Sequence, residues 1–379
     1  MSRVSSSRAR RMRMRGLIRK EALQILRDPS SIAIAFLLPL LLLLLFGYGI
    51  SLDARNVPVA IVVEAPTPQT ASFVGSFEQS AYFEPRQLQH RQDAEELLVR
   101  GEVNAIVVLR SDFSRRYRDP RGSPIQVIVN GTDANTARLI TGYVQGAWVA
   151  WLTQVARAEG LPLTLPVTLQ SRVWFNEAVS SRNYLVPGLI AIIMTLIGAL
   201  LTALVIAREW ERGTMEALLV TPVSTSEILL GKLIPYFVLG MGGMALSVAM
   251  AIVLFGIPFE GSFTVLGITS ALFLLVALGM GLLISTVSKN QFVAGQVAII
   301  VTFLPALILS GFIFDIASMP VVVQWITHVI AARYFVAILQ TVFLAGNVWS
   351  VIIPNALALA LMAIFFLGMT WRKTPKKLD

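Results

Sequence analysis

Six apolar runs, each long enough to cross a lipid bilayer, constrain this chain more than any other feature. A transmembrane helix needs about 20 mainly apolar residues, and none of the six runs contains Asp, Glu, Lys or Arg. With 55% hydrophobic and only 14% charged residues, the chain is far more apolar than a soluble domain. We therefore expect an α-helical integral membrane protein with six transmembrane helices. The predicted spans are residues 32–50, 184–207, 233–258, 263–288, 292–314 and 351–371.

The basic residues gather at the two ends of the chain. Residues 1–31 hold nine Lys and Arg against two acidic residues, and residues 372–379 hold four Lys and Arg. Because positively charged segments beside a span stay in the cytoplasm, we expect both ends on that side, as six crossings require. In residues 1–31, apolar positions recur at helical spacing as far as Asp28-Pro29, which predicts an interfacial helix before the first span. No small-x-small cleavage site follows that span, so it should remain as an anchor.

Residues 53–182, between the first two spans, have the composition of a soluble domain. If the first crossing starts in the cytoplasm, this domain lies on the extracytoplasmic side. Strand-like runs alternate with helical patterns, so the segment predicts a large α/β domain. The strand-like runs are residues 57–63, 105–109 and 125–129, and the helical patterns are residues 69–80, 93–100 and 133–159.

The segment between the second and third spans, residues 208–232, carries the densest group of charges. Five charged residues fall within nine positions, and at mid-bilayer they would cost about 12 to 17 kcal/mol. The segment must therefore lie in water or against protein. The five are Arg208, Glu209, Glu211, Arg212 and Glu216.

The same segment also has an amphipathic pattern. Met215, Leu218 and Leu219 recur at helical spacing, Thr221-Pro222 ends the run, and a serine at 224 or 226 can cap the next helix. This pattern predicts a short helix lying across the membrane face. A solvated turn whose charges only fix the topology is the alternative.

Residues 318–346 are apolar, but His328 and Arg333 interrupt them. The pieces on each side are too short to cross a bilayer, so we expect two half-helices that dip from the external face and pack against protein. A seventh span is the alternative, but it would put the C-terminus outside.

The sequence argues against catalysis by this chain itself. The nearest approach to a phosphate-binding G-x-x-x-x-G-K-[ST] motif has Ser226 in place of the first glycine and Leu233 in place of the final Ser or Thr. The chain has no cysteine, and its two histidines, His90 and His328, do not have metal-ligand spacing. Uncharged spans also disfavour an ion-coupled carrier, which keeps an ionisable group at mid-membrane.

Several motifs carry a family resemblance. The run Arg-Glu-x-Glu-Arg-Gly-Thr-Met-Glu-x-Leu from Arg208, followed by Thr221-Pro222 and by Leu-Gly-Lys at 230–232, resembles the cytoplasmic loop of ABC-2 type exporter permeases of the bacterial multidrug branch. Residues 111–114 and 125–137 resemble the external domain of that family. Residues 332–335 and 343–346 resemble its external helical hairpin, whose matching residues are Arg333, Tyr334 and Phe335.

The resemblance implies a permease subunit of an ATP-driven exporter in the bacterial inner membrane, with an apolar or amphipathic substrate that is drug-like or lipid-like. It implies alternating access, a second permease chain that is either a copy or a sibling, and separate ATPase subunits that bind ATP and Mg. A periplasmic adaptor and membrane lipids are further candidate partners; nucleic acid is not. The residues expected to couple the chain to its ATPase are Arg208, Glu209, Glu211, Arg212, Gly213, Thr214, Met215, Glu216, Leu219 and Pro222.

Within that set we expect polar contacts with the ATPase from Glu209, Glu211 and Arg212, a packed face from Met215 and Leu219, and close approach at Gly213. We expect no catalytic residue, cofactor or metal in this chain. A membrane receptor or envelope-assembly scaffold, whose external domain binds a ligand or partner, is the alternative function. It would need no bound ATPase.

Overall fold

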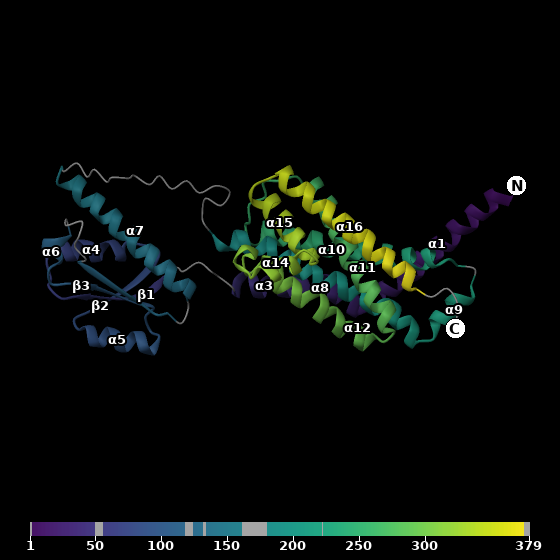
Figure 1. Cartoon of the computed structure of the whole chain (residues 1–379), viewed down its shortest axis with the longest axis horizontal. Helices are drawn as coiled ribbons and strands as arrows, with labels where there is room; N and C mark the ends of the chain where they lie inside the picture. Colours follow the sequence, from purple (N-terminus) through teal and green to yellow (C-terminus); the bar gives the residue numbers. More distant parts are fainter. Residues whose placement is uncertain are drawn as a thin grey trace. The chain divides into compact units, whose positions relative to one another are not determined.

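The computed structural model describes residues 2–49, 56–117, 124–131, 134–160, 180–221 and 223–374. The chain divides into two compact units (Figure 1). The smaller unit is Leu52–Arg172, and the larger joins Met1–Ser51 to Val173–Asp379.

The smaller unit is built on a four-stranded sheet of order β2-β1-β3-β4. Its central strand β1 pairs in parallel with β2 and β3, and β4 pairs antiparallel with β3. Successive side chains of β1 point to opposite faces, so Val59 and Ile61 join one core while Ala60 and Val62 join the other. The strands are β1 (Val57–Val63), β2 (Phe83–Leu88), β3 (Ala105–Leu109) and β4 (Ile125–Val129).

Helices cover both faces of this sheet. Aromatic residues of α4 (Pro68–Glu78), α6 (Phe113–Arg116) and α7 (Ala134–Ala158) pack over one face, and α5 (Arg91–Arg100) covers the other (Figure 1). The three predicted strands are confirmed at the predicted bounds. The strand β2 was missed, because its sequence FEPRQL is largely polar and contains a proline, both of which an edge strand tolerates. The extracytoplasmic location of this unit stays a prediction.

The larger unit is a helical bundle. Among the described residues, six helical segments are long and apolar enough to cross a membrane, and each of the six predicted spans falls on one of them. Four of the segments are single helices: α8 (Ser181–Glu211), α10 (Thr225–Val253), α11 (Phe263–Ser288) and α16 (Trp349–Lys373). The segment Pro29–Gly49 joins α2 (Pro29–Ile32), a π-helical turn η1 (Ala33–Leu37) and α3 (Leu38–Gly49). The segment Gln291–Leu309 joins α12 (Gln291–Ala298), the π-helical turn η2 (Ile299–Phe303) and α13 (Leu304–Leu309).

In two of these segments a π-helical turn ends two residues before a proline. The turn η1 precedes Pro39, and η2 precedes Pro305. A proline inside a helix has no N–H to donate and its ring clashes with the carbonyl four residues earlier, so a locally widened turn accommodates it. The carbonyl four residues before Pro39 belongs to Ala35, and its oxygen lies against Gly243 of α10, where no larger residue would fit.

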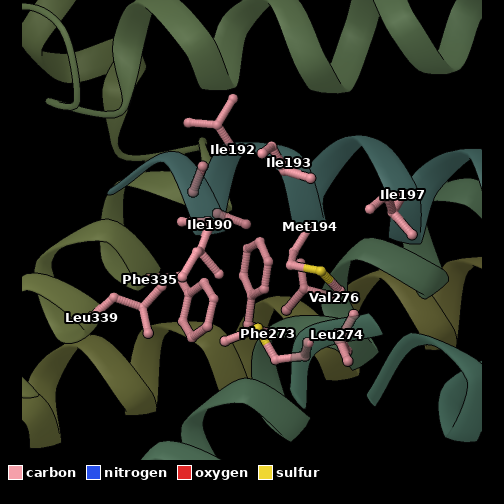
Figure 2. Close-up of a cluster of buried hydrophobic side chains, with 14 of the residues drawn as sticks. Ile190, Ile192, Ile193, Met194, Ile197, Phe273, Leu274, Val276, Phe335 and Leu339 are labelled. Atoms are coloured by element: carbon pink, nitrogen blue, oxygen red, sulfur yellow. The ribbon is translucent and has the colours of Figure 1, made fainter. Parts of the chain in front are cut away.

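Helix α8 is the centre of the bundle. Almost every residue from Val186 to Ala207 is buried, because α3, α10, α11, α12 and α15 (Ala331–Leu344) pack around it (Figure 1). Figure 2 shows Ile190, Ile193 and Met194 of α8 above Phe273 of α11. The Phe273 ring stacks on Phe335 of α15 with 4.1 Å between ring centroids.

The contact between α8 and α11 relies on small and hydroxyl-bearing residues. Gly281 of α11 lies directly against Ala199 and Thr202 of α8. The Thr202 hydroxyl donates to the carbonyl of Leu278 at 2.8 Å, and the Ser285 hydroxyl accepts from the N–H of Ala207 at 2.8 Å. Small residues let two helix backbones approach closely, and in a bundle this gives both packing and polar contacts.

The charged segment after the second span differs in part from its prediction. Helix α8 does not stop at Ala207 but continues to Glu211, and the short helix α9 (Thr214–Val220) starts only after a turn at Gly213. Gly213 has a φ of 68°, which favours glycine and ends α8. The predicted cap of the next helix is confirmed at Ser224, which forms a reciprocal capping box with Glu227.

The interrupted apolar segment forms α14 (Val321–Thr327) and α15, bent by 82° at their junction. The Arg333 guanidinium donates across the bend to the hydroxyl of Thr327, and the Tyr334 hydroxyl donates to the carbonyl of His328 at 2.8 Å. A bent pair of this kind fits either a re-entrant hairpin or a broken span. The hairpin interpretation stays a prediction.

Candidate functional site

Four charged side chains meet where α8 ends and α10 begins, and we call them the charge cluster. They come from three helices: Lys20 and Glu21 from α1 (Ser2–Leu26), Glu209 from the last turn of α8, and Lys232 from α10. Leu17 of α1 lies against Gly231, the residue before Lys232, so the two helices approach closely at this point. The cluster therefore joins three separate stretches of sequence.

Lys232 is the centre of the charge cluster. Its Nζ lies 2.8 Å from Oε1 of Glu21 and 2.9 Å from Oε1 of Glu209. Lys20 Nζ lies 2.7 Å from the same oxygen of Glu209 and 3.3 Å from Glu21. Two positive and two negative charges thus balance inside the cluster.

Burial makes this balance necessary. The side chains of Lys232 and Glu21 are each 3% exposed and that of Glu209 is 6% exposed, whereas Lys20 is 46% exposed. An unpaired charge at such depth costs several kcal/mol, and only close, well-made pairs offset that cost. The arrangement holds α1, α8 and α10 in one relative position.

The charge cluster also reaches α9. The hydroxyl of Thr214, the first residue of α9, donates to Oε2 of Glu209 and, at 3.3 Å, to its backbone carbonyl. Met215 beside it is buried, with 1% of its surface exposed. Glu209 is therefore the residue through which α9 is attached to α10 and α1.

A second ion pair lies next to the cluster. Arg208 Nη1 donates to Oδ2 of Asp28 at 2.9 Å, and its Nε donates to Gln291 at 3.2 Å. Partial burial acts to raise the pKa of Asp28, but hydrogen bonds from Ser30, Arg208 and Ser31 outweigh it and lower that pKa to about 2. Gln291 is the first residue of α12, and its backbone N–H donates to Glu211 at 2.8 Å, so α8 is attached to the start of α12 as well.

Two further contacts anchor this end of the bundle. Glu227 of the capping box accepts a hydrogen bond from Arg13 of α1 at 3.1 Å. The Nζ of Lys289, between α11 and α12, lies 4.7 Å from the centre of the Trp210 ring, a cation–π contact. Helices α1, α8, α10 and α12 are thus linked to one another here by polar contacts.

The sequence-predicted coupling residues separate into two groups. The solvent-exposed residues are Glu211, Arg212, Gly213, Thr214 and Glu216, and Arg208 is partly exposed. Those that are buried are Glu209 and Met215. The side chain of Leu219 and the residue Pro222 lie outside the described residues.

Glu209, which we expect to make a polar contact with the ATPase, is buried and paired with Lys20 and Lys232, and that expected contact stays a prediction. Lys232 would otherwise be a buried cation in an apolar helix, and Glu209 lies on the helix face that can neutralise it. By contrast, the side chains of Arg212 and Glu216 are exposed and make no hydrogen bond or ion pair within the part of the chain that the structure describes. They remain available to a partner.

Sequence reasoning did not find the partners of Glu209. A lysine about two turns into a membrane-spanning helix, as Lys232 is, indicates that a buried acid is needed. The partners lie 211 and 23 residues away from Lys232 along the chain, in Glu21 and Glu209. No spacing rule connects positions so far apart.

Comparison with known proteins identifies the family. The family described as ABC-2 family transporter protein matches residues 29–372. An Escherichia coli K12 protein named "Probable multidrug ABC transporter permease YbhS" is 47% identical over 97% of this chain and 98% of its own length. Another, named "Probable multidrug ABC transporter permease YbhR", is 30% identical over 86% of this chain and 89% of its own length. "Inner membrane transport permease YhhJ" of the same organism is 29% identical over 82% of this chain and 83% of its own length. The chain belongs to the ABC-2 family of transporter proteins.

Proposed function

We propose that this permease exports apolar or amphipathic molecules, drug-like or lipid-like, from the cytoplasm or the inner leaflet by alternating access. As an ABC-2 permease it is a multi-pass inner-membrane transport subunit, and ATP with Mg acts through a separate ATPase partner. The family also implies a dimeric arrangement of permeases. Spans without charged interiors and the word multidrug in the names of two relatives support the proposed substrate class.

The observation that carries the proposal is the attachment of α9. Glu216 on this short helix and Arg212 in the turn before it are exposed to solvent, while Thr214 at the start of α9 is bonded to Glu209 of the charge cluster. A force applied to α9 is therefore transmitted to α8, α10 and α1 together. We assign to α9 and the turn before it the contact with the ATPase, in place of a contact through Glu209.

Helix α8 carries the movement across the membrane in this proposal. Its 31 residues span about 46 Å at 1.5 Å per residue. Near its other end, Tyr184 donates to the carbonyl of Gly311 at 3.2 Å, and Gly188 lies against Phe312. Displacement of the Glu209 end would change these contacts, and through Phe273 and Phe335 it would also move the α14–α15 hairpin.

We also propose an orientation. Both chain ends and α9 lie in the cytoplasm, and the sheet-bearing unit and the α14–α15 hairpin lie outside. The concentration of basic residues at the two ends supports it. In that position the sheet-bearing unit could contact a periplasmic adaptor.

Reversal of the two free charges tests the coupling surface. In the variant Arg212→Glu with Glu216→Arg, neither side chain has a partner within the described chain to lose, so the fold should remain intact. We expect less co-purified ATPase subunit and at least about tenfold less ATP-dependent efflux, because two interface charges are reversed. The measurement is a mild-detergent pull-down with an ATP hydrolysis assay, together with drug efflux from cells.

Glu102→Arg is the control, because Glu102 is a half-exposed acid in the other unit whose ion pair, with Arg86 at 3.9 Å, is also half-exposed. It should leave ATPase binding unchanged. If the wild-type chain brings down no nucleotide-binding subunit at all, the receptor or scaffold function is favoured and the coupling role of α9 is wrong.

A further inference from the structure

A hollow of about 850 Å³ lies between α1, the end of α8 and the start of α12. Arg19, Lys20 and Arg27 line it on one side, and Arg208 and Arg212 line it on the other. Asp28 is its single acidic lining residue, so the formal charge of the lining is four positive units in excess. Its volume falls in the range of small-molecule sites and is enough for a phosphate-bearing headgroup.

The cations in this hollow are of two kinds. Lys20 and Arg208 are held by the charge cluster and by Asp28. The side chains of Arg19, Arg27 and Arg212 are exposed and make no ion pair or hydrogen bond with any described residue. Three guanidinium groups are thus free to bind an anion: those of Arg19 in α1, Arg27 directly after α1 and Arg212 at the end of α8.

Two exposed leucines belong to the same part of α1. Leu23 lines the hollow and is 42% exposed, and Leu26, which precedes the lining residue Arg27 in sequence, is 70% exposed. Arg208 follows directly on the uncharged stretch of α8 that ends at Ala207, which puts the hollow at the depth where apolar side chains give way to charged ones. That depth corresponds to the lipid headgroup layer on whichever side of the membrane α8 ends.

We propose that this hollow binds the phosphate of an anionic ligand, with the headgroup of an anionic phospholipid as its source. Planar guanidinium groups bind phosphate oxygens in pairs, and the exposed leucines would contact the first methylenes of the acyl chains. Because Lys20 and Arg208 also belong to the contacts that hold α1 to α8, a bound lipid stabilises the same junction that positions α9. Arg212 also belongs to the surface assigned to the ATPase, so the inference and its test rest on Arg19 and Arg27, which that contact does not use.

The test uses the full chain purified in detergent, with binding of phosphatidylglycerol and phosphatidylcholine read by native mass spectrometry. In the variant Arg19→Gln with Arg27→Gln, selective binding of phosphatidylglycerol should fall about thirtyfold, because each basic residue near anionic lipid contributes about a fivefold gain. Arg11→Gln with Arg15→Gln is the matched control: it removes the same charge from exposed positions of α1 outside the hollow. It should keep the selectivity.

A second variant protects the test from misfolding. Gly16 lines the hollow, and a side chain there would meet no atom within 4 Å. Gly16→Asp therefore adds a negative charge without removing any arginine, and it should abolish the selectivity, while Gly16→Ala should keep it.

Four outcomes decide the matter. If only the hollow variants lose selective binding of phosphatidylglycerol, and added inorganic phosphate does not reduce that binding in the wild type, a lipid headgroup is supported. If inorganic phosphate competes with phosphatidylglycerol for the wild type, a phosphate site whose source is soluble is supported. An equal loss in the control pair means diffuse attraction to basic residues and overturns the proposal. Unchanged lipid binding with loss of the co-purified ATPase subunit would make the hollow a protein contact, which also overturns it.

Discussion

At the scale of single residues, Lys232 has the largest consequence. It directly precedes the uncharged remainder of α10, yet it is 97% buried and held between Glu21 and Glu209. Burying a paired charge adds little net stability compared with an apolar residue of the same size, but removing one partner is costly because the other is left unpaired. The charge cluster is therefore better understood as fixing the arrangement of three helices than as adding to stability.

Lys232→Met tests that account. The variant leaves Glu21 and Glu209 buried with only Lys20 to neutralise both, so we expect destabilisation of about 3 to 5 kcal/mol. Thermal unfolding in detergent measures it. Adding Glu21→Gln restores charge balance and should recover part of the loss, a coupling that a double-mutant cycle isolates. Strictly additive effects of the two substitutions would contradict it.

The pH dependence of the neighbouring groups follows from their pKa shifts. Burial acts to lower the pKa of Lys20, but the hydrogen bond and charge of Glu209 and the charge of Glu21 outweigh it and raise that pKa above 10.5. The raised pKa of Lys20 gives stability that is lost only as the pH rises above 10.5 and through that raised pKa. The lowered pKa of Asp28, about 2, gives stability that is lost only as the pH falls from about 4 towards 2. We expect the difference in melting temperature between wild type and Asp28→Asn to be constant from about pH 5 to 9. A difference that titrates within that range would contradict the assignment.

At the scale of elements, the contact between α8 and α11 decides how the bundle moves. Gly281 lies so close to Ala199 and Thr202 that a methyl group has no room there. Contacts of this kind keep two helices together as one body. A displacement of the end of α8 should therefore carry α11 with it.

Gly281→Ala should separate these two helices. We expect destabilisation of about 1 to 3 kcal/mol from overpacking, with a lower melting temperature and impaired efflux. Gly267→Ala on the same helix is the control, because a side chain at 267 meets no atom within 4 Å. Equal melting temperatures for the two variants would mean that the close contact does not hold the helices together.

Elements whose pattern is set by burial could be predicted from the sequence, and others could not. The strand β1 and the six spans are apolar runs with clear limits, so their positions follow from composition and spacing. The strand β2 is an edge strand, and its polar sequence gives no such signal. The charges from Arg208 to Glu211 indicate water or protein but not the end of a helix, so α8 extends into them and stops only at Gly213, where the backbone takes a positive φ. The partners of Lys232 required the folded structure, because only packing brings α1 to α10.

At the scale of the whole molecule, the chain joins a sheet-bearing unit to a helical bundle whose central helix ends in the charge cluster. The helix α9 is attached to that cluster through Thr214, and two exposed charged residues lie there, Arg212 in the turn before α9 and Glu216 on α9 itself. We propose that an ATPase subunit binds at this surface. The whole bundle would then respond to one contact.

Site-directed cross-linking measures that contact most directly, because the chain has no cysteine and a single introduced thiol is unique. Glu216→Cys and, as control, Glu102→Cys would each be labelled with a short photo-reactive thiol reagent in membranes that contain the co-expressed ATPase subunit. The account predicts a cross-linked permease–ATPase product from position 216 and none from position 102. Absence of the product at 216, in membranes from which the ATPase subunit still co-purifies with the permease, would contradict it.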